Sequence, residues 1–148
     1  MNPINLYYCA NWLYRHKIPV LPAVIQQTLF FIFQAVVPYK TKIGKNCRLA
    51  HGGNGVVIHQ DVKIGDNVLI CHQVTIGGRG YLARLPIIGS DVYIGPGAKI
   101  LGPVTIGDNC VIGANAVVSR NIPSNCVASG FPAQILKRHI DAHKIENW

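Results

Sequence analysis

The stretch IGSDVYIGPGAKILGPVTIGDNCVIGANAVV, residues 88 to 118, decides the fold. An aliphatic residue recurs at every sixth position, and a small residue follows four positions after each of the five isoleucines. The aliphatic positions are Ile88, Ile94, Ile100, Ile106, Ile112 and Val118, and the small ones are Val92, Ala98, Val104, Cys110 and Ala116. A period of six fits neither an α-helix nor an alternating strand. It predicts a chain that makes a short strand, turns a corner and repeats, with the aliphatic side chains inside.

The same phase extends towards the N-terminus through Ile58, Ile64, Ile70 and Ile76. Three such hexads close one triangular coil, so we expect a parallel β-solenoid over residues 38 to 133. Counting forward by three hexads then predicts which side chains stack inside the prism. One predicted column contains Ile58, Ile76, Ile94 and Ile112, and another contains Ile70, Ile88 and Ile106.

The composition suits one globular domain in a reducing compartment. The chain has 148 residues, of which 49% are hydrophobic and 14% charged, and this balance excludes a disordered chain. The net charge of +8 is spread along the sequence without a basic block. We therefore expect attraction to an anionic ligand or surface and no nucleic-acid partner. The five cysteines lack CxxC spacing, and Cys47 and Cys110 fall at small core positions, as expected in the cytoplasm.

Residues 1 to 37 precede the repeat and predict two helices. Pro19 and Pro22 interrupt the chain, and residues 23 to 37 are almost wholly apolar. A membrane span needs about 20 apolar residues, which this run lacks, and no cleavage site follows it. Two interpretations stay open. Either the second helix covers the open end of the prism or another subunit, or residues 18 to 37 lie on the inner surface of a membrane.

Two interruptions of the repeat carry polar residues, and departures from a strict repeat are where function is expected. The insertion HGGNG contributes His51 and Asn54. The second interruption, GGRGYLARLPI at residues 77 to 87, is predicted to leave the wall as a loop and contributes Arg79 and Arg84. His51 is the candidate general base because glycines flank it, although no acidic residue stands out as its orienting partner.

Three histidines lie close in sequence: His51, His59 and His72. Their spacings of eight and 13 match neither the coil length nor a compact ligand motif, so we expect no metal site. His59 is predicted to face solvent. His72 is predicted to lie one face away from His51 and to point outward near the loop.

One further constellation follows from the coil length. Gly78, Pro96 and Ala114 are spaced by three hexads each and should form one outward column of small residues. Such a column is either a preference of corners for small residues or a shallow groove for a long, thin ligand. Lys137 and Arg138 follow the last coil, near the expected upper end of the column, where they would meet phosphates.

These motifs resemble those of the hexapeptide-repeat acyltransferases, and within them the serine acetyltransferase-like branch that includes exopolysaccharide O-acetyltransferases. The similar segments are HGGNGVVIH (51–59), VTIGGRG (74–80), IGSDVYIGPGAKILGPVTIGDN (88–109), IGANAVV (112–118) and SGFPAQILK (129–137). The resemblance implies an all-β, left-handed parallel β-helix, acetyl-CoA as donor, and a homotrimer with active sites between prisms. We expect the β-helix domain to follow an N-terminal helical segment (1–37) and to precede a C-terminal helical tail (134–148).

The resemblance also implies roles for single residues. His51 matches the catalytic base of the family. The expected cofactor-binding residues are Gly78, Arg79, Pro96, Ala114, Lys137 and Arg138. The expected acceptor-binding residues are Asn54, His72 and Arg84. The chain departs from the serine acetyltransferases at Ala50 and Leu85, where they have aspartate and histidine, and it lacks their aspartate partner near Val36.

These departures favour a sugar over serine as the acceptor, because the ammonium group of a free amino acid needs an acidic partner. We expect an acetyl-CoA-dependent O-acetyltransferase acting on a hydroxyl of a sugar or polysaccharide precursor, with Tyr81 as an aromatic contact. Two alternatives stay open. One is a serine O-acetyltransferase of cysteine biosynthesis, and the other is a non-catalytic trimeric β-helix that binds a ligand or acts as a scaffold.

Overall fold

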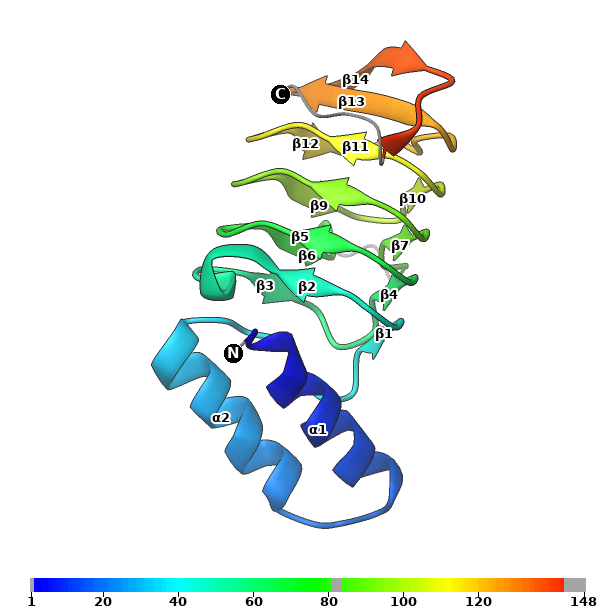
Figure 1. The fold of residues 1–148 in the computed structure, drawn as a ribbon. Helices are drawn as coiled ribbons and strands as arrows, with labels where there is room; N and C mark the ends of the chain where they lie inside the picture. The colour runs from blue at the N-terminus through cyan, green and yellow to red at the C-terminus, as the bar shows by residue number, and fades with distance from the viewer. Residues whose placement is uncertain (1, 81–83, 143–148) are drawn as a thin grey trace.

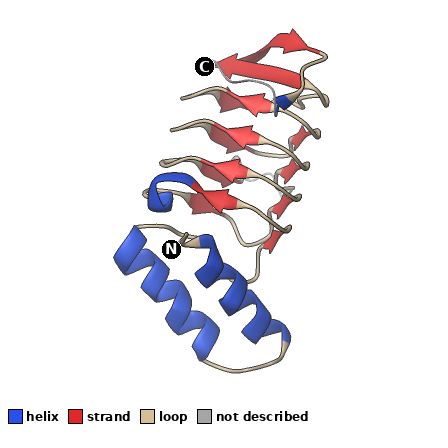
Figure 2. Cartoon of the chain, in the orientation of Figure 1, coloured by secondary structure: helices blue, strands red, loops and turns tan. Residues whose placement is uncertain are grey.

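The computed structural model describes residues 2–80 and 84–142. The chain forms a triangular prism of short strands with two helices at one end (Figures 1 and 2). The helices are α1 (Ile4–Arg15) and α2 (Leu21–Phe33). The prism is a left-handed parallel β-helix, so the expected fold class is confirmed.

Three sheets form the walls of the prism. Face 1 contains β1 (Lys42–Ile43), β4 (Lys63–Ile64), β7 (Ile87–Ile88) and β10 (Thr105–Ile106). Face 2 contains β2 (Arg48–Leu49), β5 (Leu69–Ile70), β8 (Tyr93–Ile94), β11 (Val111–Ile112), β13 (Cys126–Gly130) and β14 (Ala133–Arg138). Face 3 contains β3 (Val57–Ile58), β6 (Thr75–Gly77), β9 (Lys99–Leu101) and β12 (Val117–Val118). The chain passes through faces 1, 2 and 3 in turn, and each strand therefore lies above the one a full coil earlier.

The interior columns differ from those obtained by counting three hexads per coil. In the structure, neighbouring coils pair Ile64 with Ile88, Ile70 with Ile94, and Ile76 with Ile100. The predicted column of Ile58, Ile76, Ile94 and Ile112 is therefore wrong only at the step from Ile76 to Ile94, since Ile58 pairs with Ile76 and Ile94 pairs with Ile112. In the predicted column of Ile70, Ile88 and Ile106, the first step is wrong because Ile70 lies on face 2 and Ile88 on face 1, whereas Ile88 does pair with Ile106.

The segment between β6 and β7 causes this shift. Ile76 and Ile88 are two hexads apart in the sequence but lie on successive faces, whereas Ile58 and Ile64 make the same kind of step in a single hexad. Residues 78–80 and 84–86 form no strand, as the predicted loop requires, and residues 81–83 of that loop lie outside the described residues. The hexad phase survives the loop, and Ile88 remains 2% exposed.

The two helices cover the open N-terminal end of the prism (Figure 1). Tyr7 and Leu29 are each 1% exposed and belong to the same core cluster as the first coils. The Tyr8 hydroxyl donates to the carbonyl of Gly44 at 2.6 Å, which fixes α1 to β1. These contacts support the interpretation that the helices cover the end of the prism. Among the residues that the structure describes, neither helix has the length and apolar character that a membrane crossing needs.

The C-terminal segment forms a strand and not the predicted helix. β14 pairs antiparallel with β13 at the outer end of face 2. It supplies partners for the outer backbone groups of β13, which an uncovered edge strand would leave unpaired. The chain then returns to Asn109, whose side chain bonds the Ile140 carbonyl and the Ala142 N–H. Residues 143–148 of the predicted helical tail lie outside the described residues.

Two adjacent isoleucines of β7 test which side chains fill the prism. Ile88 is 2% exposed, and Ile87 is 45% exposed on the outer surface. We expect Ile88→Ala to lower the free energy of unfolding by about 2–5 kcal/mol, because it leaves a cavity in the core. The control Ile87→Ala should cost less than about 1 kcal/mol. Urea denaturation measures both values, and equal losses would contradict the inward position of Ile88.

Candidate functional site on one edge of the prism

His51 lies in the turn η1 (Ala50–Gly53), which the HGGNG insertion forms between faces 2 and 3. The φ angles of His51, Gly52 and Gly53 are 51°, 70° and 67°, so three successive residues are left-handed. Glycine tolerates this conformation, and at Gly53 a Cβ would also come within 2.9 Å of the Leu49 side chain. The two glycines therefore allow a sharp turn that leaves the His51 side chain exposed, as the sequence predicts.

His72 stands directly beside His51. The two ring centroids are 5.1 Å apart, and the rings are perpendicular at 89°. The expectation that His72 lies one face away is wrong, because the HGGNG insertion makes this coil longer than three hexads and aligns the two positions. The sequence could have predicted this pairing only if the inserted residues had been counted as part of the coil that separates the two histidines. His59, by contrast, faces solvent with 47% exposure, as predicted.

The histidine pair holds unused hydrogen-bonding capacity. His72 Nδ1 is buried and has no hydrogen-bond partner among the described residues. A buried polar atom without a partner is rare in proteins, and a catalytic role is one of the established explanations for such an atom. The exposed His51 imidazole can therefore accept a proton from a polar ligand, with the His72 ring beside it.

A single edge of the prism continues from these histidines. The residues two positions after the inward aliphatics of face 2 form a column, which we call the histidine edge: His51, His72, Pro96 and Ala114. Backbone bonds join its members, since Gly97 N–H donates to His72 O at 3.0 Å and Asn115 N–H donates to Pro96 O at 2.8 Å. Small residues above the histidines leave this edge shallow.

Gly78 does not lie on the histidine edge, so the predicted column of Gly78, Pro96 and Ala114 is wrong for a single chain. Gly78 follows β6 at the corner between faces 3 and 1, which we call the loop edge. The Gly102 N–H donates to Gly77 O at 3.0 Å, so Gly102 is its neighbour in the next coil. The additional hexad between β6 and β7, which changed the pairing of the inward isoleucines, also explains why Gly78 lies at a different corner from Pro96 and Ala114.

The predicted arginines also belong to the loop edge. Arg79 packs beside Gly102, where an added Cβ would lie 3.0 Å from the Arg79 Cβ. Arg84 is exposed and follows the same segment. Tyr81, the predicted aromatic contact for a sugar, lies outside the described residues. Within one chain, neither arginine is on the edge that carries His51.

Lys137 and Arg138 are exposed on β14, opposite Val127 and Cys126. The part of β14 that reaches the histidine edge is its beginning, where Ala133 pairs with Gly130. The expectation that both cations lie near the upper end of the small-residue column is therefore wrong. The reason is that β14 runs antiparallel and carries them back across face 2.

The remaining polar candidates have structural partners. The Asn54 side chain donates to Gln34 Oε1 of the helical segment at 3.4 Å. Asp66 Oδ1 accepts the Lys45 N–H, and Asp108 Oδ1 accepts the Ser90 N–H, each at 2.7 Å. These aspartates link successive coils at another corner and do not orient His51. In the described part of the chain, no three histidine, cysteine, aspartate or glutamate side chains group as a metal site would require.

The fold and this edge define a class of protein, a hexapeptide-repeat β-helix with a histidine pair at a corner. Residues 86–120 match the family described as bacterial transferase hexapeptide (six repeats). The chain is similar to a serine acetyltransferase of Helicobacter pylori, with 37% identity over 134 residues that cover 89% of this chain and 78% of the relative. A serine acetyltransferase of Synechococcus elongatus is 36% identical over 131 residues, which cover 87% of this chain and 53% of the relative.

The crystal structure of serine acetyltransferase in complex with coenzyme A from Brucella abortus strain S19 has a TM-score of 0.85 and 34% identity to this chain. The match covers 91% of this chain and 54% of that chain. This protein thus spans about half the length of the Synechococcus and Brucella relatives. It belongs to the hexapeptide-repeat transferase family and is a homologue of the serine acetyltransferases. None of these three relatives supports the exopolysaccharide branch of the resemblance.

Proposed function

We propose that this protein is an acetyl-CoA-dependent O-acetyltransferase in which His51 is the general base. The observation that carries the proposal is the exposed His51 in a strained, glycine-rich turn, with the His72 ring 5.1 Å away. The His51 imidazole takes the proton of an acceptor hydroxyl as its oxygen attacks the thioester carbonyl carbon. The carbon–sulfur bond then breaks, and the leaving thiolate takes the proton from the imidazolium. The products are the acetyl ester and free coenzyme A.

Acetyl-CoA is supported as donor by the family and by the Brucella relative, whose structure contains coenzyme A. The histidine edge suits a thin pantetheine arm, because Pro96 and Ala114 continue the edge above His72 without long side chains. Lys137 and Arg138 remain proposed contacts for the phosphates of acetyl-CoA. They would reach the cofactor only if it is bound between their own chain and a neighbouring copy.

A homotrimer accounts for the separated cofactor residues. Face 3 lies between the histidine edge and the loop edge, and Val57 on its outer surface is 42% exposed. A depression of about 480 Å³ on this face is bordered by Val36, Val57 and Leu101. In a closed three-fold ring that buries face 3, the histidine edge of one copy faces the loop edge of the next. Gly78 and Arg79 of one copy would then face Pro96 and Ala114 of its neighbour.

The relatives support L-serine as the acceptor, since those from both bacteria are named serine acetyltransferase. Arg84 is exposed and suits the serine carboxylate. One observation favours a second candidate, a sugar hydroxyl. Ala50 and Leu85 offer no partner for an ammonium group, and Asp66 and Asp108 are bound to backbone N–H groups. Contact of residues 18 to 37 with a membrane, which would suit a lipid-linked acceptor, stays a prediction.

Steady-state release of free thiol from acetyl-CoA distinguishes these acceptors. With L-serine we expect kcat/KM of about 10⁴ M⁻¹s⁻¹ or more, and little release with nucleotide sugars or glycans. Arg84→Gln should raise KM for L-serine about tenfold, the cost of one charged contact, whereas the control Arg48→Gln on face 2 should not. Release with glycans alone would replace serine by the second candidate. No release with any acceptor would leave a binding or scaffold module.

A further inference from the structure

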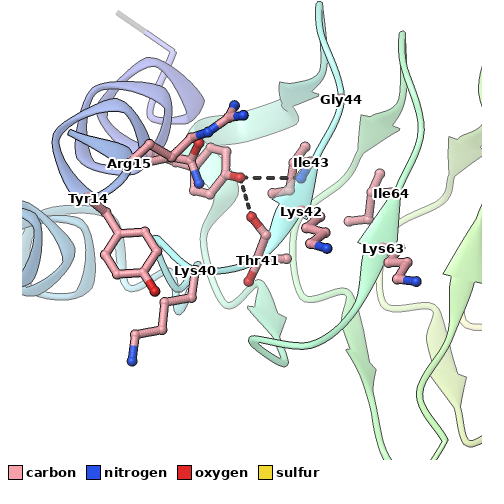
Figure 3. Close-up of a pocket in the computed structure, with 11 residues that line it drawn as sticks. Tyr14, Arg15, Lys40, Thr41, Lys42, Ile43, Gly44, Lys63 and Ile64 are labelled. Atoms are coloured by element: carbon pink, nitrogen blue, oxygen red, sulfur yellow. Dashed lines mark hydrogen bonds between the residues drawn. The ribbon is translucent and has the colours of Figure 1, made fainter. Parts of the chain in front are cut away.

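A hollow of about 480 Å³ lies between α1 and the first strands of face 1 (Figure 3). Four cationic side chains line it: Arg15 from α1, Lys40 before β1, Lys42 in β1 and Lys63 in β4. None of its lining residues is acidic. The residues that line this hollow include none of those assigned to the histidine edge or to the loop edge, so the hollow is distinct from the proposed acetyl-transfer site.

Among the described residues, no carboxylate pairs with these four cations, although the Asp66 carboxylate lies beside Gly44 at the rim, where it accepts the Lys45 N–H. The first acidic residue of the chain is Asp61, so the helical segment and β1 contain none. The Asp61 carboxylate lies 3.8 Å from His59 Nδ1. Among the described residues, no carboxylate oxygen comes within 4.0 Å of Arg15, Lys40 or the two strand lysines. Within the part of the chain that the structure describes, no ion pair therefore neutralises their positive charge.

Two of the cations repel each other directly. Lys42 and Lys63 are register partners on β1 and β4, and both are exposed on the outer surface of face 1. Neighbouring strands are about 4.8 Å apart, and like charges placed opposite one another are destabilising. The next outward positions of the face are Ile87 and Thr105, which are uncharged. The charge is thus concentrated at the hollow.

The floor of the hollow is preformed. The Tyr7 hydroxyl donates to the Thr41 carbonyl at 2.5 Å and accepts the Ile43 N–H at 3.3 Å (Figure 3). The Asn11 side chain donates to the Tyr39 carbonyl at 2.7 Å. Burial raises the pKa of Tyr7 above its ordinary value, so the phenol stays neutral and adds no negative charge. These bonds hold α1 against β1, and a ligand would not have to order the site.

We propose that this hollow binds a phosphate-bearing anion, either a free phosphate ester or diphosphate, or the same group on a lipid. A phosphate carries about 1.5 to 2 negative charges and accepts several hydrogen bonds, which matches a cluster of cations better than a single carboxylate does. A zwitterion such as a free amino acid suits the hollow less well, because all four charged lining residues are cationic and would repel its ammonium group. The exposed side chains of Phe31 and Ile32 on α2 are the reason for testing a lipid source.

Calorimetric titration of the full chain with pyrophosphate at about 150 mM salt, close to the physiological ionic strength, tests the free source. The test variant is Lys42→Gln with Lys63→Gln. The control is Lys17→Gln with Lys45→Gln, which removes the same charge from lysines outside the hollow. Co-sedimentation with phosphatidylcholine vesicles, with and without phosphatidic acid, tests the lipid source on the same proteins.

We expect binding that weakens about tenfold or more in the test variant and less than about twofold in the control. Pyrophosphate binding with this pattern supports a free phosphate ligand. Binding only to phosphatidic acid vesicles, with the same pattern, supports a lipid-borne phosphate. Equal loss of affinity in both double variants would show that binding depends only on net charge and would overturn the proposal. Absence of binding to both pyrophosphate and the vesicles would also overturn it. The melting temperature of the test variant should not fall, because the substitution removes a repulsion.

Discussion

Replacement of His51 by alanine is expected to lower kcat by a factor of about 10² to 10⁴, which is the usual contribution of a general base. The fold and the affinity for coenzyme A should persist, because the His51 side chain is exposed and its ring packs against the His72 ring. Thiol release with the acceptor that proves active measures kcat, and calorimetry measures the affinity.

The matched control for this variant is His16→Ala. His16 is also an exposed histidine, but it caps the C-terminus of α1, where its ring stacks on Trp12, and it lies on neither edge of face 3. Its loss should leave kcat within about twofold of the parent, as for a surface substitution. If His51→Ala kept most of its turnover, the assignment of the base would be wrong, and His72 would be the next residue to replace.

Substitution of Ala114 by tryptophan is expected to weaken coenzyme A binding by about 100-fold or more, a cost of about 2.7 kcal/mol. Ala114 is exposed on the histidine edge, so the indole would fill the shallow groove without entering the core. The interior should be unaffected, because the neighbouring inward residue is Ala116, which is 0% exposed. Calorimetry with coenzyme A measures the loss, and size-exclusion chromatography checks that the assembly persists.

The control for the groove is Thr105→Trp, which places the same side chain on the exposed outer surface of face 1. It should leave coenzyme A affinity unchanged, because Thr105 lies on neither edge of face 3. Equal affinities of the Ala114 variant and the parent would refute a cofactor groove on the histidine edge. Equal losses in both variants would point to a general disturbance of the prism.

The C-terminal segment illustrates where local sequence is a poor guide. Residues 133 to 138 have no hexad and follow the last repeat, so a helical tail was a reasonable expectation. In the structure they form β14, because the neighbouring strand β13 has backbone groups that need partners. This requirement belongs to the tertiary structure, since it arises only where the stack of strands ends.

The sequence by itself determined which side chains face inward. The hexad repeat places aliphatic residues inside on every stroke, and Ile88, Ile94 and Ile100 are at most 2% exposed. It also located the candidate base, since His51 interrupts the repeat and is followed by two glycines that permit a left-handed turn. Both inferences rest on local geometry, in which side-chain direction and backbone freedom are properties of the residue and its immediate neighbours.

Only the tertiary structure decided which residues lie above one another. The pairing of residues in successive coils depends on the number of residues at each corner. Hydrogen bonds between coils fix this pairing only after the chain has folded. The insertion near His51 brings His72 beside it, and the additional hexad before Ile88 moves Gly78 away from Pro96 and Ala114. A hexad repeat specifies whether each side chain points inward or outward, but it does not specify the face on which each hexad lies. An insertion can move the following hexads to another face while their aliphatic side chains still point inward.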